Sequence, residues 1–317
     1  MEGLERVQAE LGGPDVVDRL VALSGSDFTT AMLEVARRRA ARQTPATVLR
    51  RYQRDRFTRP SHIPWRDLRR AEDALLGCLD DGFEVLTLAP VVPLAAHSAL
   101  GTVSQHKVLT AMRACEVAAD PTNALALEAA TRRVLAGAGT VRLAAVQRVT
   151  RASKMPDIPG FYPHFSLLGL VTAGRDTGSL RFEVSALTEH LRFAIAGLRA
   201  VGERHVQVAL TPLSDGGRRV AAELTERLRD TGAEIVTDDA RQAGRGYYLE
   251  LCFKLNTESG EIGDGGFTDW TAKLTSNAKE RLLISGYGLD RLASGHPSAP
   301  HPGPAPAPHQ DSPPRPI

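Results

Sequence analysis

Strand-like apolar runs between residues 141 and 285 are connected in two different ways, and this constrains the fold more than any other feature of the sequence. Some consecutive runs are separated only by a turn-rich segment, whereas others are separated by a helical pattern. Short turns join antiparallel strands, and helices allow longer crossovers between strands. We therefore expect an α+β fold, in which a mixed, mainly antiparallel sheet is flanked by helices.

The individual elements follow from apolar periodicity and from turn residues. Strands are expected over residues 83–88, 141–149, 165–173, 206–210, 234–237, 247–255 and 282–285. Helices are expected over residues 183–200, 215–231 and 268–274, with loops over residues 154–163 and 260–266. The strand and helix pattern near residues 200–240 indicates a small α/β insertion.

The two ends of the chain differ from this middle part. Residues 1–64 indicate a helical extension that includes a helix over residues 28–41, which Ser26 or Asp27 could cap. A helix over residues 65–80 begins the core, which we place at residues 65–296. Nine of the 21 residues from 297 to 317 are proline, so we expect a disordered tail there.

Charge and cysteine content exclude several classes of protein. Lys plus Arg (39) nearly balances Asp plus Glu (37), which is unlike a histone-type polycation. The three cysteines form no CxxC pair, and no apolar run has the roughly 20 residues that a membrane helix needs. The charged N-terminus does not resemble a signal peptide. We therefore expect a cytoplasmic protein without membrane contact.

A basic segment spans residues 37–59, where nine arginines accompany a single acid, Asp55. Guanidinium groups bind phosphate oxygens well, so this segment could contact RNA. The alternative, which the near-zero net charge favours, is a solvated helix face that is partly paired with acids. The sequence leaves both interpretations open.

Familiar catalytic signatures are absent from the sequence. It contains no GxxxxGK[ST] phosphate loop, no GxGxxG between a strand and a helix, no HExxH and no GxSxG. The histidines show no spacing typical of metal ligands, so we expect no metal site built from protein side chains.

What remains is an order of segments. A strand ends at Pro90, a GTVSQ loop follows, and a later strand ends with Arg151. Then come the segments HFSLLG (164–169), RGYY (245–248), GGFTD (265–269) and GYGLDRL (286–292). In this order they resemble the catalytic core of class II aminoacyl-tRNA synthetases, in the histidyl-tRNA synthetase-like branch. That branch includes the regulatory subunit of ATP phosphoribosyltransferase, and the resemblance covers about residues 66–292.

The resemblance implies a nucleotide site and a dimer. Arg151 matches the arginine that binds the ATP α-phosphate, and Arg291 matches the one on the γ-phosphate side. Phe165 matches the aromatic residue that stacks on adenine. Further implications are close approach of the backbone to the nucleotide at Gly286 and Gly288, Mg²⁺ bound with ATP, and a homodimer formed through residues 83–90.

The resemblance also implies a pocket for an amino acid or another small carboxylate. Its expected residues are Tyr247, Tyr248, Gly265, Gly266, Thr122 and Glu128. Tyrosines there would provide a flat apolar wall with a hydroxyl group. Thr122 stands where the family has an acid, and Glu128 lies nearby.

The sequence departs from the family at several points. Arg151 is followed by Ala152 and Ser153, whereas the synthetases have a glutamate two residues after this arginine. Leu167 and Val171 replace polar residues that hold the ammonium group of the amino acid. The arginine before the tyrosine pair corresponds to Ala243, although Arg241 and Arg245 flank it. No anticodon-binding domain follows Leu292, so tRNA is not the expected partner.

Three functions are compatible with these features. The chain could be a stand-alone synthetase paralogue that activates a carboxylate with ATP for a non-tRNA acceptor, such as a protein. It could be a non-catalytic regulatory subunit that binds an enzyme partner. The basic segment could also bind RNA. Retention of Arg151 and Arg291 favours the first.

Overall fold

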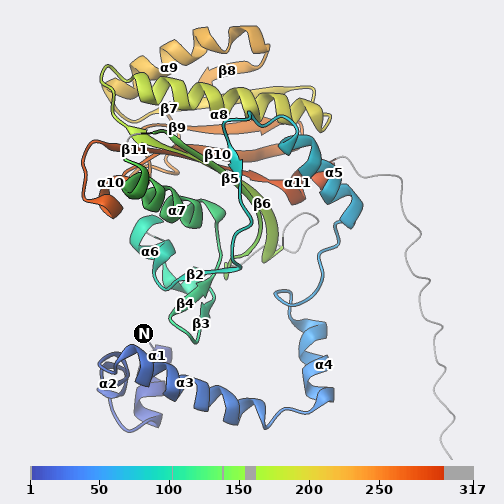
Figure 1. Cartoon of the computed structure of the whole chain (residues 1–317). Helices are drawn as coiled ribbons and strands as arrows, with labels where there is room; N and C mark the ends of the chain where they lie inside the picture. The colour runs from blue at the N-terminus through green and yellow to red at the C-terminus, as the bar shows by residue number, and fades with distance from the viewer. Residues whose placement is uncertain (1, 102, 138, 154–161, 296–317) are drawn as a thin grey trace, which may run out of the picture.

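The computed structural model describes residues 2–101, 103–137, 139–153 and 162–295. Its centre is an eight-stranded sheet with the strand order β1-β5-β6-β11-β10-β9-β7-β8 (Figure 1). The strands are β1 (Glu84–Val85), β5 (Val141–Thr150), β6 (His164–Arg175), β7 (Val206–Pro212), β8 (Glu234–Thr237), β9 (Leu249–Thr257), β10 (Gly260–Thr268) and β11 (Glu280–Gly288). All pairs from β5 to β7 are antiparallel, and the outer pairs β1–β5 and β7–β8 are parallel. The predicted mixed, mainly antiparallel sheet is confirmed.

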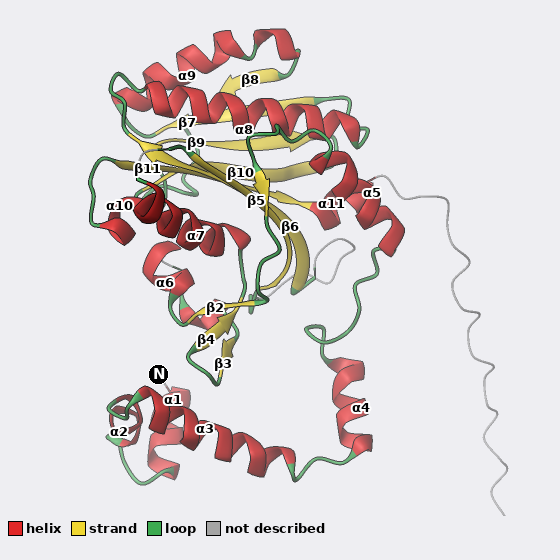
Figure 2. Cartoon of the chain, in the orientation of Figure 1, coloured by secondary structure: helices red, strands yellow, loops and turns green. Residues whose placement is uncertain are grey.

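Helices cover both faces of this sheet, as Figure 2 shows. One face carries α5 (Trp65–Leu76), α8 (Arg181–Ala200), α9 (Asp215–Arg227) and α11 (Leu289–Gly295). The opposite face carries α6 (Ala96–Gly101), α7 (Pro121–Ala136) and α10 (Trp270–Thr275). Two 3₁₀ turns, Gln105–Lys107 and Arg229–Thr231, complete the helical elements of the core. No helix in the described part of the chain is both long and apolar enough to cross a bilayer.

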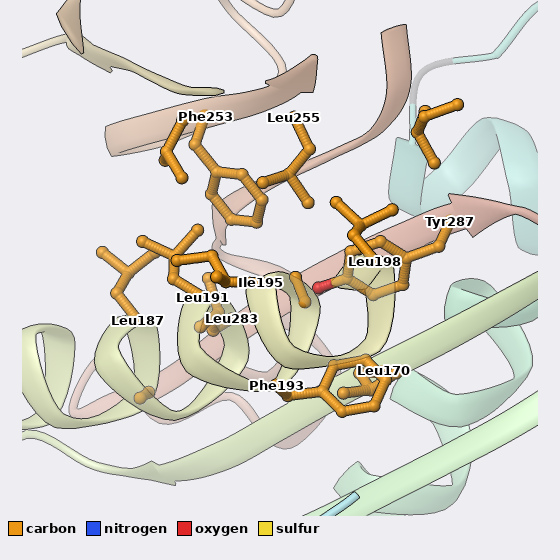
Figure 3. Packing of buried hydrophobic residues seen from close by; sticks show 14 of the residues in the cluster. Leu170, Leu187, Leu191, Phe193, Ile195, Leu198, Phe253, Leu255, Leu283 and Tyr287 are labelled. Atoms are coloured by element: carbon orange, nitrogen blue, oxygen red, sulfur yellow. The ribbon is translucent and has the colours of Figure 1, made fainter. Parts of the chain in front are cut away.

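The largest apolar cluster lies between α8 and the sheet (Figure 3). Leu187, Leu191 and Leu198 recur at helical spacing on α8 and are fully buried. They pack with strand residues such as Phe253 of β9 and Leu283 of β11. This cluster makes α8 and the central strands one rigid unit, on which the site described below is built.

One predicted loop is a strand. Residues 260–266 belong to β10, which pairs with both β9 and β11. A Cβ at Gly263 would lie 2.4 Å from the Gly286 carbonyl oxygen, and one at Gly265 would lie 2.5 Å from that of Ile284. Glycine is used here because the neighbouring backbone leaves no room for a side chain, so the glycine-rich sequence imitates a loop.

Other predicted bounds shift by smaller amounts. The strand expected over residues 83–88 pairs only at Glu84–Val85, and the strand expected from residue 247 begins at Leu249. The expected insertion near residues 200–240 forms β7, α9 and β8, which extend the same sheet at its edge. A separate three-stranded sheet consists of β2 (Val91–Pro93), β3 (Thr110–Ala111) and β4 (Cys115–Val117).

The N-terminal helices stand apart from this core (Figure 1). They are α1 (Glu2–Glu10), α2 (Val16–Val21), α3 (Gly25–Ala40) and α4 (Pro45–Arg54), and we call residues 2–60 the arm. The cap of α3 is Ser24, whose hydroxyl accepts the Asp27 N–H, so the expected cap at Ser26 or Asp27 was wrong by two or three residues. No residue from 3 to 60 is buried. The predicted tail at residues 297–317 lies outside the described residues.

Candidate functional site

Arg151 and Arg291 line one cavity of about 210 Å³. Arg151 follows β5, and Arg291 lies in the first turn of α11, directly after β11. Because β5, β6 and β11 are neighbours in the sheet, their ends bring these two distant arginines to one place. The same cavity is lined by Phe165, Gly286 and Gly288.

Arg151 has partners on three sides. Its Nε donates to the Ala119 carbonyl oxygen at 3.0 Å, and its Nη2 donates to Asp120 Oδ2 at 3.1 Å. Its Cζ also lies 5.2 Å from the centre of the Phe165 ring, a cation–π arrangement. Arg151 therefore has a carboxylate and an aromatic face as partners within the chain.

Arg291 and the glycines form the opposite wall. Its guanidinium group donates to the Glu261 carbonyl oxygen of β10. A Cβ built on Gly286 would meet no atom within 4 Å, so this glycine faces open space in the cavity. The open cradle beside two guanidinium groups fits a phosphate-bearing ligand, because backbone and cations can both approach the phosphate oxygens.

Asp290 fixes the start of α11 against β6. Its Oδ2 accepts the Ser166 N–H at 2.8 Å, and its Oδ1 lies 3.4 Å from Arg148 Nη2. The carboxylate is buried, so these contacts hold the first turn of α11, and with it Arg291, in a defined position.

A second compartment of about 710 Å³ adjoins the first. Asp120, Arg151, Glu261 and Asp264 line both compartments. Tyr247 and Tyr248 form a wall of the second compartment, with ring centres 4.7 Å apart and planes at 88°. Burial, followed by the charges of nearby carboxylates, raises the pKa of both hydroxyls, so they stay protonated as hydrogen-bond donors.

The second compartment contains an ion pair between a buried arginine, Arg241, and a partly exposed carboxylate, Asp264. Arg241 Nη2 lies 3.2 Å from Asp264 Oδ2, and only 4% of the Arg241 side chain is exposed. Arg241 Nη1 is buried and has no hydrogen-bond partner within the described residues. Burial raises the pKa of the Asp264 carboxyl, and nearby Asp120 and Glu261 add to this, while Arg241 opposes it. The compartment thus presents both a carboxylate and an unsatisfied guanidinium nitrogen.

Buried His97 and Glu116 hold the segment that precedes α7. His97 Nδ1 lies 2.6 Å from Glu116 Oε1, and His97 Nε2 accepts the Ala119 N–H at 2.9 Å. His97 must therefore carry its proton on Nδ1 and donate it to Glu116. These contacts fix Ala119 and Asp120, whose oxygen atoms are two of the groups that hold Arg151.

The other predicted site residues are outside both compartments. Thr122 is buried, and its hydroxyl donates to Asp120 Oδ1 at 2.7 Å, so it supports a lining residue. A Cβ on Gly266 would lie 2.6 Å from the Tyr248 ring, which places this glycine behind the tyrosine wall, and neighbouring Gly265 packs against Phe253. Glu128 pairs with Arg132 and lines a different groove, formed with residues 86–93.

Sequence reasoning missed three groups of the second compartment: Asp120, Arg241 and Asp264. Asp120 precedes a proline, a pattern typical of a helix N-terminus, and it caps α7. Arg241 was noted only as a flanking residue. Nothing in the sequence shows that Arg241 and Asp264 meet, because this depends on the conformation of residues 238–248 beside β10.

The arm joins the cavity wall at its root. His164 Nε2 donates to the Arg59 carbonyl oxygen at 2.7 Å, since its Nδ1 accepts from Arg148 Nε. The His62 and Tyr162 rings lie 5.7 Å apart. Tyr162 lines the first compartment, so the segment that directly follows the arm touches the wall of the cavity.

Comparison with known proteins identifies the fold. The sequence matches no protein-family model and no curated protein. An ATP phosphoribosyltransferase regulatory subunit/histidyl-tRNA synthetase from Bacillus halodurans is similar in structure, with a TM-score of 0.59 and 14% identity over 75% of this chain and 82% of that chain. A histidine–tRNA ligase subunit from Alicyclobacillus acidocaldarius gives 0.56 and 16% over 72% and 92%, and Staphylococcus aureus histidyl-tRNA synthetase gives 0.55 and 13% over 72% and 64%. The chain therefore has the fold of the class II aminoacyl-tRNA synthetase core, in the form found in histidyl-tRNA synthetase and the ATP phosphoribosyltransferase regulatory subunit.

Proposed function

We propose that this protein activates a small carboxylate with ATP and transfers the acyl group to an acceptor other than tRNA. The observation that carries this proposal is that Arg151 and Arg291 line the same cavity, together with Phe165 and Gly286. Two permanently charged donors beside an aromatic ring and an open glycine suit the triphosphate and the base of one nucleotide.

The proposed reaction is a displacement at phosphorus. A carboxylate oxygen of the substrate attacks the α-phosphorus of ATP, the bond from that phosphorus to the bridging oxygen breaks, and pyrophosphate leaves with the electron pair. Negative charge on the phosphate oxygens increases during this step. Arg151 would stabilise it at the α-phosphate, and Arg291 would hold the γ-phosphate side. The Arg151 guanidinium lies over one face of the Phe165 ring. An adenine base that stacks on this face would displace the guanidinium, which could then bind the α-phosphate.

The second compartment would hold the carboxylate substrate, and an amino acid suits it. Asp120 and Asp264 can each pair with an ammonium group, which compensates for the missing family acid at Thr122. Tyr247 and Tyr248 provide a flat wall for the side chain. Mg²⁺ would arrive with the triphosphate, since no group of three or more His, Cys, Asp or Glu side chains in the described residues is arranged to hold a metal ion.

We also propose that two copies associate through residues 83–90, as the resemblance implies. Val85 and neighbouring Val91 are exposed, and Leu86, Leu88 and Val91 line an apolar groove there. We further propose that the protein is cytoplasmic, as the sequence predicts.

A specific observation supports a second candidate, a regulatory binding subunit. Both arginines have partners within the chain: Arg151 has Asp120 and Phe165, and Arg291 has the Glu261 carbonyl. Groups of the chain itself therefore position both guanidinium groups, an arrangement that also suits a binding subunit without catalysis. The position two residues after Arg151 is also a serine rather than the glutamate of the synthetases.

Pyrophosphate exchange with a panel of amino acids tests the first candidate, and calorimetric titration with ATP accompanies it. We expect exchange with at least one amino acid, and a loss of about 10²–10³-fold in Arg151→Ala and Arg291→Ala. Arg229→Ala, which removes an exposed arginine outside both the cavity and the proposed dimer interface, is the matched control. ATP binding without exchange for any amino acid would favour the regulatory candidate. Absence of both exchange and ATP binding would contradict the first candidate.

A further inference from the structure

The arm has apolar surface but no core of its own. All four helices carry exposed apolar side chains, including Val21 at 76% and Leu11, next to α1, at 57%. Helices of this length are only marginally stable in water unless an apolar face is covered. Exposed apolar surface of this extent marks an interaction site. A partner must therefore cover the arm.

The arm also has two halves of opposite charge. Residues 1–36 contain seven acids and two arginines, whereas residues 37–59 contain nine arginines and one acid. Glu34 pairs with Arg37 and Arg38 at the boundary. Five further arginines make no ion pair within the described residues: Arg39, Arg42, Arg50, Arg51 and Arg54. The cationic half thus lacks the acids that would neutralise it.

Beyond the Glu34 pairs at the boundary, the outer ends of the two halves lie apart within one chain. Figure 1 shows α1 and α4 at opposite ends of α3, which separates them by the length of a 16-residue helix. In an antiparallel pair of arms, however, the acidic end of each arm lies on the basic end of the other. A two-fold interface produces this match twice, because each contact from one copy to the other is repeated in reverse.

We propose that the arm pairs antiparallel with the arm of a second copy, so that α1 of each chain packs on α4 of the other. Leu4, Val7 and Leu11 form one stripe on and directly after α1, at i, i+3 and i+7. Val48, Leu49 and Tyr52 form an exposed stripe on α4. Basic side chains flank the α4 stripe, and acidic ones accompany the α1 stripe, so apolar burial and charge pairing act together.

This arrangement explains more of the arm than RNA binding does. A nucleic acid would attract residues 37–59 but would be repelled by the acidic half. It would also leave the apolar stripes uncovered. A second copy satisfies the acidic half, the basic half and both stripes at once.

Charge reversal in the full-length protein tests the proposal. The basic-half variant is Arg50→Glu, Arg51→Glu and Arg54→Glu, and the acidic-half variant is Glu5→Arg, Glu10→Arg and Asp18→Arg. Arm pairing is measured as a thiol cross-link between a chain that carries Ala9→Cys on α1 and a second chain that carries Ala46→Cys on α4. All chains also carry Cys78→Ser and Cys115→Ser, which remove the partly exposed native thiols. This cross-link reports the arms whatever other surface joins the two copies.

We expect each variant alone to lose about tenfold or more of the cross-link at low salt, because like charges then face each other. Chains of one variant mixed with chains of the other should cross-link nearly as well as wild type, since every contact again joins opposite charges. Cross-linking that is unchanged by reversal, or that mixing fails to restore, would overturn the proposal. So would a basic-half variant whose defect is confined to RNA binding.

Discussion

Arg133 of α7 and Glu280 of β11 form a bidentate ion pair, with Nε–Oε2 and Nη2–Oε1 distances of 2.8 and 2.7 Å. Both side chains are buried, so the pair joins α7 to the middle of the sheet. We expect Arg133→Met to lower the free energy of unfolding by about 3–5 kcal/mol, because Glu280 is left buried without its cation. Denaturant unfolding measures this change.

The double variant Arg133→Met, Glu280→Leu should recover most of the loss, since no charge stays buried. Arg132→Met removes a neighbouring but partly exposed arginine and should cost at most about 1 kcal/mol. A double variant as unstable as Arg133→Met alone would contradict this account.

Gly286 and Gly169 should respond differently to a methyl group. At Gly286 the methyl would enter open cavity space, so Gly286→Ala should fold with stability within about 1 kcal/mol of wild type. At Gly169 it would lie 2.7 Å from the Pro121 ring at the start of α7, and Gly169→Ala should cost about 1–3 kcal/mol. Thermal unfolding measures both.

Ligand binding separates the two glycines further. Gly286→Ala should weaken ATP binding by calorimetry while leaving stability intact, because its methyl occupies the cavity. Normal ATP affinity in Gly286→Ala would show that the nucleotide binds elsewhere.

Buried His190 predicts loss of stability in acid. Burial, with a smaller contribution from the charge of Arg142, lowers the pKa of His190 to about 3 from 6.5. Below pH 6.5 the unfolded chain binds a proton that the folded chain does not, so this stabilisation is complete above pH 6.5 and is lost as the pH falls toward 3. His190 should account for about 2 kcal/mol between pH 7.5 and pH 5.

His190→Gln isolates this contribution. Although it is less stable overall through lost hydrogen bonds to Thr172 and Ser285, its free energy of unfolding should fall less between pH 7.5 and 5. Exposed His205 is the control, and His205→Gln should retain the wild-type pH dependence. An unchanged pH dependence in His190→Gln would refute the assignment.

Arg241 should stabilise the protein in a pH-dependent manner. Burial raises the pKa of Asp264, and removal of the Arg241 cation raises it further. Arg241→Met should therefore cost about 1 kcal/mol at pH 7, where Asp264 is ionised without its partner, because the partly exposed carboxylate is screened by solvent. The deficit should shrink toward pH 4, because protonation of Asp264 removes the uncompensated charge. Unfolding at both pH values measures this, and a deficit that is the same at both would argue against the ion pair as its cause.

The parts of the fold that the sequence predicted are those with one apolar face. On α8, leucines recur at helical spacing because one side packs on the sheet and the other meets solvent. Helix α7 was not predicted, because its alanine-rich surface is buried on several sides and shows little periodicity. Strand β10 was missed because its glycines accommodate neighbouring backbone.

The site divides in the same way. Arg151 and Arg291 could be located because short motifs at strand ends carry them, and the structure brings them to one cavity. Arg241 and Asp264 could not be paired from sequence, since their contact depends on how a loop folds across β10. Glu128 is close in sequence to Thr122 but lines another groove. The six-residue separation between them on α7 turns the Glu128 side chain away from the side of the helix that Thr122 occupies.

The contacts of Arg59 with His164, and of His62 with Tyr162, connect the base of the arm to the wall of the cavity. Phe165 and Tyr162 both line the first compartment; Phe165 follows His164, which contacts Arg59, and Tyr162 itself contacts His62. A ligand that binds in this compartment and moves Tyr162 would also move His62, next to the arm. A change in the position of the arm would in turn alter the affinity for that ligand. Ligand occupancy of the cavity and pairing of the two arms would then be thermodynamically coupled.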